Sequence, residues 1–264
     1  MSEPVVQYRT DGPVAVLTLT APPANCYSLA LMKSLDEAIL RARFDDEVEV
    51  IVVTGAGSRF FCAGADIGML ASVTPRFKYY FCLHANETLL RLEHTDKLVI
   101  AAVNGHCVGG GLEVAMACDL RIGRKDGGSF GLPEVKLGVL PGTGGTQRLA
   151  RLVGHQKALR WMVEGRTGSF DEAVAEGVFD RVLDVEADGF LDAVVAYAKG
   201  LCTPRTASMA VGHIKRAVQT GASLPLESGL ALERELQAKL FASDDATEGL
   251  DAYVEKRKAR FTGR

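Results

Sequence analysis

Several features that mark other protein classes are missing from this 264-residue chain. Its charges nearly cancel, with 30 lysines and arginines against 33 aspartates and glutamates. Binding to nucleic acid or to an anionic membrane favours an excess of positive charge, so we expect neither partner. No apolar run is long enough to span a bilayer, and the first residues lack the basic segment and apolar core of a secretion signal. We therefore expect a cytoplasmic protein whose partners are small molecules or copies of itself.

Signatures of metal, disulfide and nucleotide chemistry are also absent. No two cysteines are spaced as C-x-x-C, and neither cysteines nor histidines show zinc-ligand spacing, so we expect no metal site and no disulfides. The glycine patterns G-x-G-x-x-G and G-x-x-x-x-G-K do not occur. Cys62 and Cys107 lie beside glycine-rich loops, and we predict that both are buried core residues rather than nucleophiles.

Apolar periodicity predicts an α/β fold in the first half of the chain. Alternating residues at 5–10 and 13–20 predict two strands around a turn, and a helix is expected from Ser28 to about residue 42. Continuous apolar strands at 48–55 and 98–105 are each followed by a helical pattern, at 75–94 and from residue 109 onward. Strands that alternate with helices indicate mostly parallel pairing, with ligands beyond the carboxyl ends of the strands.

The second half is predicted to be mainly helical. Helical patterns follow one another from about residue 144, interrupted by one short strand at 179–185. The last helices carry apolar side chains such as Leu230, Leu236 and Leu240, which must pack on the chain's own core or on a neighbouring subunit. We expect a core at 1–195 and a helical oligomerisation region at 196–264.

Two loops rich in small residues are candidates for binding an oxyanion. Residues 63–65, Ala-Gly-Ala, follow the strand at 48–55, and three glycines at 109–111 follow the strand at 98–105 and open a helix. Small residues leave backbone N–H groups uncovered, and the positive end of a helix favours negative charge. Two such donors on one oxygen would stabilise an enolate or a tetrahedral oxyanion.

Two glutamates near these loops are candidates for proton transfer. Glu113 lies in the first turn of an apolar helix, and Glu134 lies between apolar residues in a loop bounded by prolines. A buried carboxylate requires a partner or a function, and two of them can serve as acid and base beside a carbonyl. Alternatively, Glu113 only complements the helix dipole, and Glu134 is a surface residue paired with Lys136.

Four segments together make the chain resemble the enoyl-CoA hydratase/isomerase (crotonase) superfamily. They are FCAGADI, AAVNGHCVGGGLEVAMACDLRI, FGLPEVKLGVLPGTGGTQRL and DDATEGLDAYVEKRKARF. The resemblance implies a spiral of ββα units followed by a helical trimerisation region, and a trimer or a dimer of trimers. It implies an acyl-CoA substrate, hydrated by an enoyl-CoA hydratase that needs no cofactor other than the CoA of that substrate.

The resemblance also implies roles for individual residues. The N–H groups of Ala65 and Gly110 would hold the thioester oxygen, Glu113 would activate water, and Glu134 would exchange the α-proton. Eight residues are expected to bind the CoA thioester. They are Ala63, Ala65, Asp66, Ile67 and Gly68 in the first loop, Gly110 in the second, and Tyr253 and Lys256 from a neighbouring subunit. Gly68 occupies a position where lysine is common in the family, so one basic contact to the CoA phosphates is missing here or supplied elsewhere.

Other functions remain open at this point. Having both glutamates favours hydration, whereas a double-bond isomerase or a hydratase for a branched, methylglutaconyl-type substrate would use the same fold. A non-catalytic acyl-CoA-binding protein would need neither carboxylate. Asp66 is expected to cap the following helix, and Tyr79 and Tyr80 either line an acyl pocket or face solvent.

Overall fold

The computed structural model describes residues 5–264 and contains two sheets of different size. The large sheet has the spatial order β1 (Val6–Asp11), β2 (Val14–Leu19), β3 (Val50–Gly55), β5 (Leu98–Val103), β7 (Leu120–Arg124) and β10 (Arg181–Leu183). The small sheet has the order β4 (Phe60–Cys62), β6 (His106–Val108), β8 (Ser129–Gly131) and β9 (Thr167–Ser169). Among these strands only the outer pairs β1–β2 and β8–β9 are antiparallel. The predicted α/β class with mostly parallel pairing is therefore confirmed.

Twelve helical segments are present in residues 5–264. They are α1 (Leu29–Arg43), α2 (Ile67–Ser72), α3 (Pro75–Glu93), α4 (Gly110–Met116), the 3₁₀ turn η1 (Glu134–Leu137), α5 (Gly145–Val153), α6 (His155–Val163), α7 (Phe170–Ala175), α8 (Ala187–Lys199), α9 (Ser208–Gly221), α10 (Leu226–Phe241) and α11 (Asp244–Val254). No helix in the described part of the chain is long and apolar enough to cross a membrane.

A repeated ββα unit builds the core. Strands β3, β5 and β7 of the large sheet are each followed by a short strand of the small sheet, namely β4, β6 and β8, and then by a helical segment. The short strands were not predicted from the sequence, because three residues are too few to show an alternation. Their parallel arrangement brings the loops that follow them to one edge of the small sheet.

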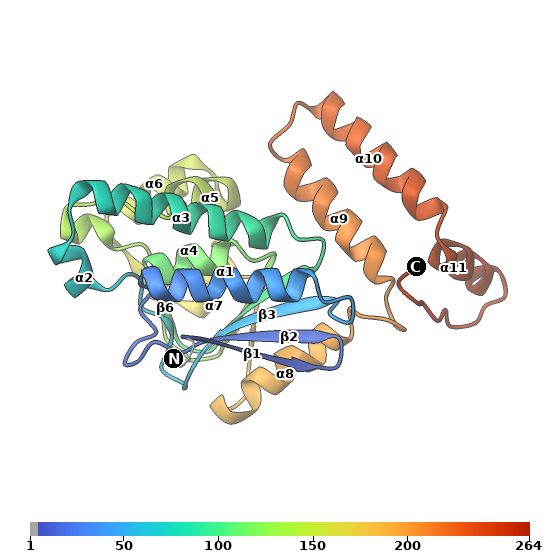
Figure 1. Ribbon diagram of the computed structural model, residues 1–264, viewed down its shortest axis with the longest axis horizontal. Coiled ribbons are helices and arrows are strands. Elements are labelled where there is room, and N and C mark those ends of the chain that lie inside the picture. The colour runs from blue at the N-terminus through green and yellow to red at the C-terminus, as the bar shows by residue number, and fades with distance from the viewer. Residues whose placement is uncertain (1–4) are drawn as a thin grey trace.

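The central strands of the large sheet are apolar throughout because both of their faces are covered. Leu17 and Val53 point into a core shared with α1 and α3, whereas Val16 and Val52 point into a second core beneath α8. Figure 1 shows α1 and α3 on one side of the sheet and α8 on the other. A continuous apolar run is the expected signature of a strand buried on both faces.

The residues that precede α1 and α3 cap these helices, as the sequence predicts. The side chain of Ser28 accepts a hydrogen bond from the amide of Leu31 at 3.3 Å, and Thr74 does the same for Phe77 at 3.2 Å. These caps satisfy amide groups that a helix leaves unpaired in its first turn. They fix where α1 and α3 begin, and α3 forms one wall of the cavity described below.

Helices α9, α10 and α11 form an arm that extends away from the two sheets (Figure 1). Lys215 of α9 anchors the arm, because its buried ammonium forms an ion pair with Asp119 at 2.8 Å and donates to the carbonyl of Leu92 at 2.8 Å. On α10 only Leu236 is buried, and Leu226 and Phe241 are 78% and 64% exposed. Of the predicted apolar face, Leu236 is buried, Leu240 is half-buried and Leu230 is exposed in one chain.

Candidate active site

A cavity of about 570 Å³ opens at the carboxyl ends of β4, β6 and β8. Its walls include residues 63–65 after β4, residues 108–110 at the end of β6, and Pro133 and Glu134 after β8. Residues 70–78, where α2 leads into α3, contribute the opposite wall. Adjacent parallel strands end at the same edge of a sheet, which is why segments far apart in sequence meet here. The two predicted oxyanion donors, Ala65 and Gly110, and the two predicted catalytic glutamates, Glu113 and Glu134, all line this cavity.

The two small-residue loops are in direct contact. A Cβ atom placed on Gly64 would lie 3.2 Å from the amide nitrogen of Gly110. Within residues 5–264, neither Ala65 nor Gly110 donates its backbone N–H to a protein acceptor. Gly110 is the first residue of α4, so its N–H has no partner inside that helix. Tyr27 pairs with the loop through backbone groups of the residues on either side of Ala65, which leaves the N–H of Ala65 unused. Two uncommitted donors at one end of a cavity form a site suited to an oxyanion.

Each of the three consecutive glycines is required by a different close approach. At Gly109, which has a φ of +55°, a Cβ atom would come within 2.9 Å of a carboxylate oxygen of Glu134. At Gly110 it would lie 1.7 Å from the ring of Tyr27, and at Gly111 it would lie 2.0 Å from the carbonyl oxygen of Cys62. Any side chain in this turn would therefore clash with Glu134, with Tyr27 or with the backbone of β4.

Glu113 is held in place by backbone amides. Its side chain is 1% exposed, and Oε1 accepts hydrogen bonds from the amides of Thr143 and Gly145, both at 2.7 Å. Burial raises the pKa of the Glu113 carboxyl above its ordinary value, and these two amides oppose part of the rise because they stabilise the ionised form. The alternative in which Glu113 only complements the helix dipole is not supported, because its carboxylate faces the cavity and has its own donors.

Glu134 begins η1 rather than lying in an irregular loop. Burial raises the pKa of its carboxyl to about 7, and the nearby charge of Glu113 adds to the rise. Its Oε2 atom is buried and has no hydrogen-bond partner within residues 5–264. No ion pair with Lys136 is formed there either, so the surface alternative is wrong. A carboxyl group that titrates near neutral pH can both donate and accept a proton.

Tyr27 joins the two halves of the site, a role that the sequence did not predict. Its hydroxyl lies 2.7 Å from Oγ1 of Thr143, its ring packs on Gly110, and its backbone amide donates to the carbonyl of Gly64 at 3.0 Å. The side chain is buried and stacks on Phe81. One residue thereby contacts the donor loop, the opening turn of α4 and the segment that holds Glu113.

A half-buried arginine supports the same segment from the other side. Arg148 of α5 forms two hydrogen bonds of 2.8 Å with the carboxylate of Glu93 and donates to the carbonyl of Thr143 at 3.0 Å. Bidentate pairing of this kind fixes the plane of the guanidinium group. The closely spaced glycines around Thr143 mark this segment in the sequence. No local pattern connects them to Glu93, so the contact could not be predicted.

The remaining predicted residues fall into two groups. Ala63 and Ile67 line the cavity, whereas Asp66 and Gly68 lie beside it; Asp66 caps α2 by accepting from the amide of Met69 at 3.0 Å, as expected. Tyr253 lies in α11 and is 85% exposed, and Lys256 follows the end of that helix. Figure 1 shows α11 at the end of the molecule opposite α2. Within one chain these two residues do not line the cavity.

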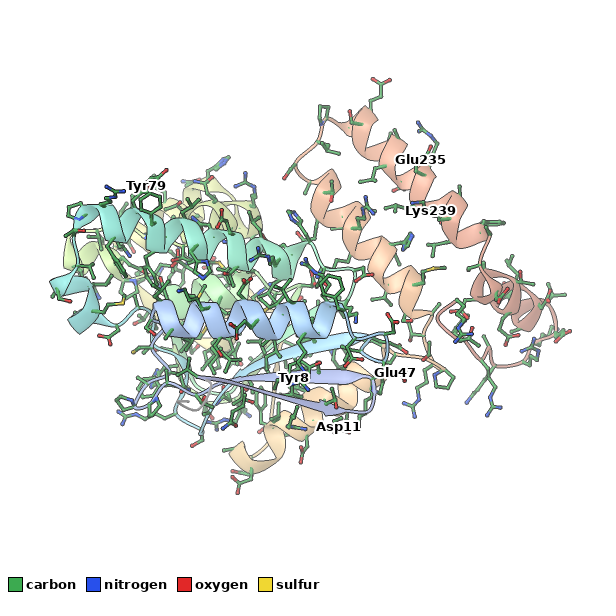
Figure 2. The ribbon with its side chains drawn as sticks, in the orientation of Figure 1. Tyr8, Asp11, Glu47, Tyr79, Glu235 and Lys239 are labelled. Carbon is green, nitrogen blue, oxygen red and sulfur yellow. The ribbon has the colours of Figure 1, made fainter. Side chains whose placement is uncertain are left out.

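The weaker candidates lie outside the cavity. Tyr79 and Tyr80 face solvent, and Tyr79 stands on the outer side of α3 (Figure 2). Cys62 and Cys107 are fully buried, as predicted, and burial raises the pKa of the Cys62 thiol to about 12. No group of three His, Cys, Asp or Glu side chains suited to a metal ion occurs in the described residues.

Comparisons with known proteins agree with the resemblance seen in the sequence. The family model described as enoyl-CoA hydratase/isomerase matches residues 9–264. The short-chain-enoyl-CoA hydratase of Clostridium acetobutylicum is 37% identical over 249 residues, and the crotonyl-CoA hydratase of Syntrophomonas wolfei is 34% identical over 249 residues; each alignment covers 94% of both chains. The crystal structure of an enoyl-CoA hydratase from Geobacillus kaustophilus superposes with a TM-score of 0.95 at 41% identity, covering 100% of this chain and 98% of that one. This chain therefore has the crotonase fold and belongs to the enoyl-CoA hydratase/isomerase family.

Proposed function

We propose that the protein is an enoyl-CoA hydratase, which adds water reversibly across the α,β double bond of an acyl-CoA thioester. The observation that carries the proposal is the pairing of two carboxyl groups in one cavity with two uncommitted amide donors. Glu113 is fixed by two amides, and the unpaired Oε2 of Glu134 is free to reach a substrate. The names of the relatives support the same activity.

The proposed reaction uses each group once. The N–H groups of Ala65 and Gly110 donate to the thioester oxygen and stabilise the enolate that forms. Ionised Glu113 takes a proton from water while the water oxygen bonds to the β-carbon and the π electrons move to the enolate. Protonated Glu134 then gives its proton to the α-carbon from the same side, which makes the addition syn. Exchange with solvent returns Glu113 and Glu134 to their starting states.

Hydration accounts for both carboxyl groups better than isomerisation does. Moving a double bond transfers a proton between two carbons and requires one base, without activation of water. Glu113 is nevertheless held by the amides of Thr143 and Gly145 in the same cavity as Glu134. Burying a second carboxylate is unfavourable, and a role in activating water explains why it is kept.

We also propose how CoA and oligomerisation relate to this cavity. Ala63, Asp66, Ile67 and Gly68 would lie along the CoA, because they form the segment at the edge of the cavity. The uncovered apolar side chains of α10 and α11 favour assembly through the arm, as a trimer or a dimer of trimers. In such an assembly Tyr253 and Lys256 would approach the CoA bound by a neighbouring subunit.

The decisive experiment measures loss of the conjugated thioester absorbance of crotonyl-CoA. We expect turnover by the wild-type protein and losses of about 10²- to 10⁴-fold for Glu113→Gln and for Glu134→Gln, because each removes one proton-transfer group. Glu87→Gln, on the exposed side of α3, makes the same chemical change outside the cavity and should retain activity. Binding of crotonyl-CoA without hydration by the wild-type protein would refute the proposed reaction.

A further inference from the structure

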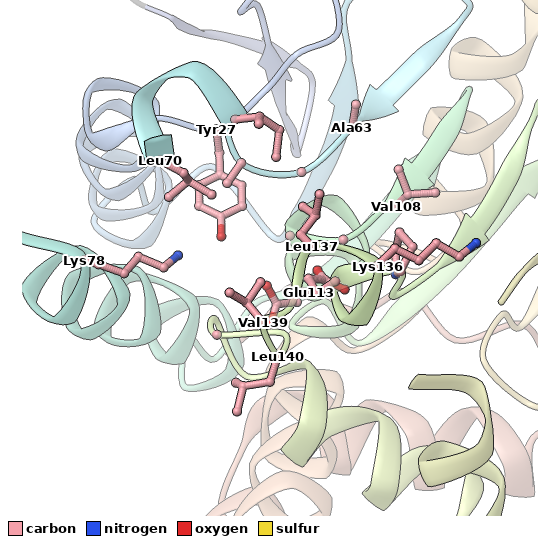
Figure 3. A pocket seen from close by; sticks show the side chains of 18 of the residues that line it. Tyr27, Ala63, Leu70, Lys78, Val108, Glu113, Lys136, Leu137, Val139 and Leu140 are labelled. Carbon is pink, nitrogen blue, oxygen red and sulfur yellow. The ribbon is translucent and has the colours of Figure 1, made fainter. Parts of the chain in front are cut away.

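The wall of the cavity formed by residues 70–78 combines apolar side chains with one cation. Leu70 and Val73 come from this wall, and Val139 and Leu140 face them from the segment after η1. Lys78, in the first turn of α3, extends into the same space. Figure 3 shows its side chain pointing inward on the side of the cavity opposite Ala63 and Val108, near the hydroxyl end of Tyr27. This region lies on the far side of the cavity from Ala63 and Val108, and under the proposed function it receives the acyl group of the substrate.

Lys78 has no carboxylate partner in the described part of the chain. No Asp or Glu oxygen lies within 4.0 Å of its Nζ atom, which stands 5.4 Å from the centroid of the Phe81 ring. The more deeply buried Lys215, by contrast, is paired with Asp119 at 2.8 Å. Glu134 interacts with Lys78 only through a longer-range charge effect, which lowers the pKa of Glu134. The half-buried ammonium of Lys78 therefore depends on solvent within the cavity.

A bound acyl group would remove that solvent. A neutral alkyl chain would leave the ammonium desolvated without a counterion, which is unfavourable, whereas an anionic group would supply the missing partner. The two glutamates of the cavity would repel an anion elsewhere in it, so the position beside Lys78 is the favourable one. Lys136 also borders the cavity, but its side chain points toward the opposite side (Figure 3).

We propose that the acyl group of the preferred substrate ends in a carboxylate that pairs with Lys78. This inference rests on the proposed function, since it names the class of enoyl thioester that the same site accepts. The apolar side chains of Leu70, Val73 and Leu140 contact the short alkyl part of the acyl group, and Lys78 binds its far end.

The first test measures binding and does not depend on turnover. Glutaryl-CoA and pentanoyl-CoA have acyl chains of equal length, and only the first ends in a carboxylate. We expect the wild-type protein to bind glutaryl-CoA about tenfold more tightly, the size expected for one charge-assisted contact. Lys78→Met keeps the aliphatic stem and should abolish this preference. Arg76→Met removes a positive charge from the exposed side of the same helix and should retain it.

The second test compares the hydration of two unsaturated thioesters, glutaconyl-CoA and pent-2-enoyl-CoA. The wild-type protein should show a higher kcat/KM for glutaconyl-CoA, and Lys78→Met should lose that advantage while it still hydrates pent-2-enoyl-CoA. Equal losses for both substrates, with a shifted pH profile, would instead make Lys78 a residue that tunes Glu134 and would overturn the proposal.

Equal binding of glutaryl-CoA and pentanoyl-CoA by the wild-type protein would overturn the proposal as well. Failure of the proposed reaction is a separate result, because it appears as no hydration of any enoyl-CoA, while the ratio of the two binding constants still reports on Lys78.

Discussion

Replacing Glu134 with glutamine should make the protein more stable at alkaline pH while it removes activity. Burial places the pKa of this carboxyl at about 7 in the folded protein, against an ordinary value of 4.5. As the pH rises from 4.5 to 7, the unfolded chain releases this proton first, so the folded state loses stability through that range. Each unit between the folded and the ordinary pKa corresponds to about 1.4 kcal/mol, so ionisation of Glu134 lowers the free energy of unfolding by about 3 kcal/mol in total. Because the side chain is only half-buried, solvent screening reduces this loss to roughly 2 kcal/mol.

The glutamine side chain carries no charge in the folded or the unfolded protein, so the variant does not lose this stability as the pH rises. At about pH 8 it should therefore unfold with a free energy roughly 2 kcal/mol above that of the wild type, which corresponds to a melting temperature roughly 4–8 °C higher for a chain of this size. At about pH 5 most of the loss is absent from the wild type, so the gain should fall below about 1 kcal/mol.

The assay is a thermal melt followed by circular dichroism at both pH values and at one fixed protein concentration, because assembly would also shift the transition. Glu87→Gln, on the exposed side of α3, serves as the matched control and should show no pH-dependent gain. A gain for Glu134→Gln that is equal at both pH values would refute the reasoning, since it would then not arise from ionisation. A loss of stability at about pH 8 would refute it more directly.

The same geometry makes four further predictions. In the hydration direction, kcat/KM should fall as the pH rises above about 7, because Glu134 must carry a proton. In the dehydration direction, kcat/KM should instead fall as the pH drops below about 7, because Glu134 must then be ionised. Gly110→Ala should abolish hydration in the thioester assay, because its Cβ atom would meet the ring of Tyr27 at 1.7 Å. Tyr27→Phe should lower kcat by about tenfold and the unfolding free energy by only about 1 kcal/mol, since it removes one hydrogen bond and keeps the ring. Lys215→Met should destabilise the protein by about 3–5 kcal/mol in urea titrations, because it leaves Asp119 buried and unpaired.

Local chemistry explains which features could be predicted from the sequence. Ser28 and Thr74 cap helices through their own hydroxyls, and the strands around Val16 and Val52 are apolar because both faces are buried. The small residues at 63–65 and 109–111 identified both loops of the proposed oxyanion site through their local composition alone. Each of these signals lies within a few residues of the feature that it specifies.

The features that escaped prediction depend on contacts between distant segments. Tyr27 reaches Thr143, and Arg148 reaches Glu93, across separations of 116 and 55 residues. Neither pair leaves a periodic pattern. The strands β4, β6, β8 and β9 are three residues long and acquire their identity only through pairing with one another. In the sequence, Lys78 likewise cannot be distinguished from the other polar residues of an amphipathic helix.

The sequence by itself determined the α/β order, the helix starts and the glycine turns, and it singled out Glu113 and Glu134 as candidates, because propensity, capping and backbone freedom act over short stretches of chain. Only the tertiary structure decided that Glu113 receives two amide donors, that Glu134 titrates near pH 7, and that Lys78 faces the cavity without a carboxylate partner in residues 5–264. Burial and electrostatic environment are set by groups that folding brings together from across the chain, so they do not exist until the loops after β4, β6 and β8 meet.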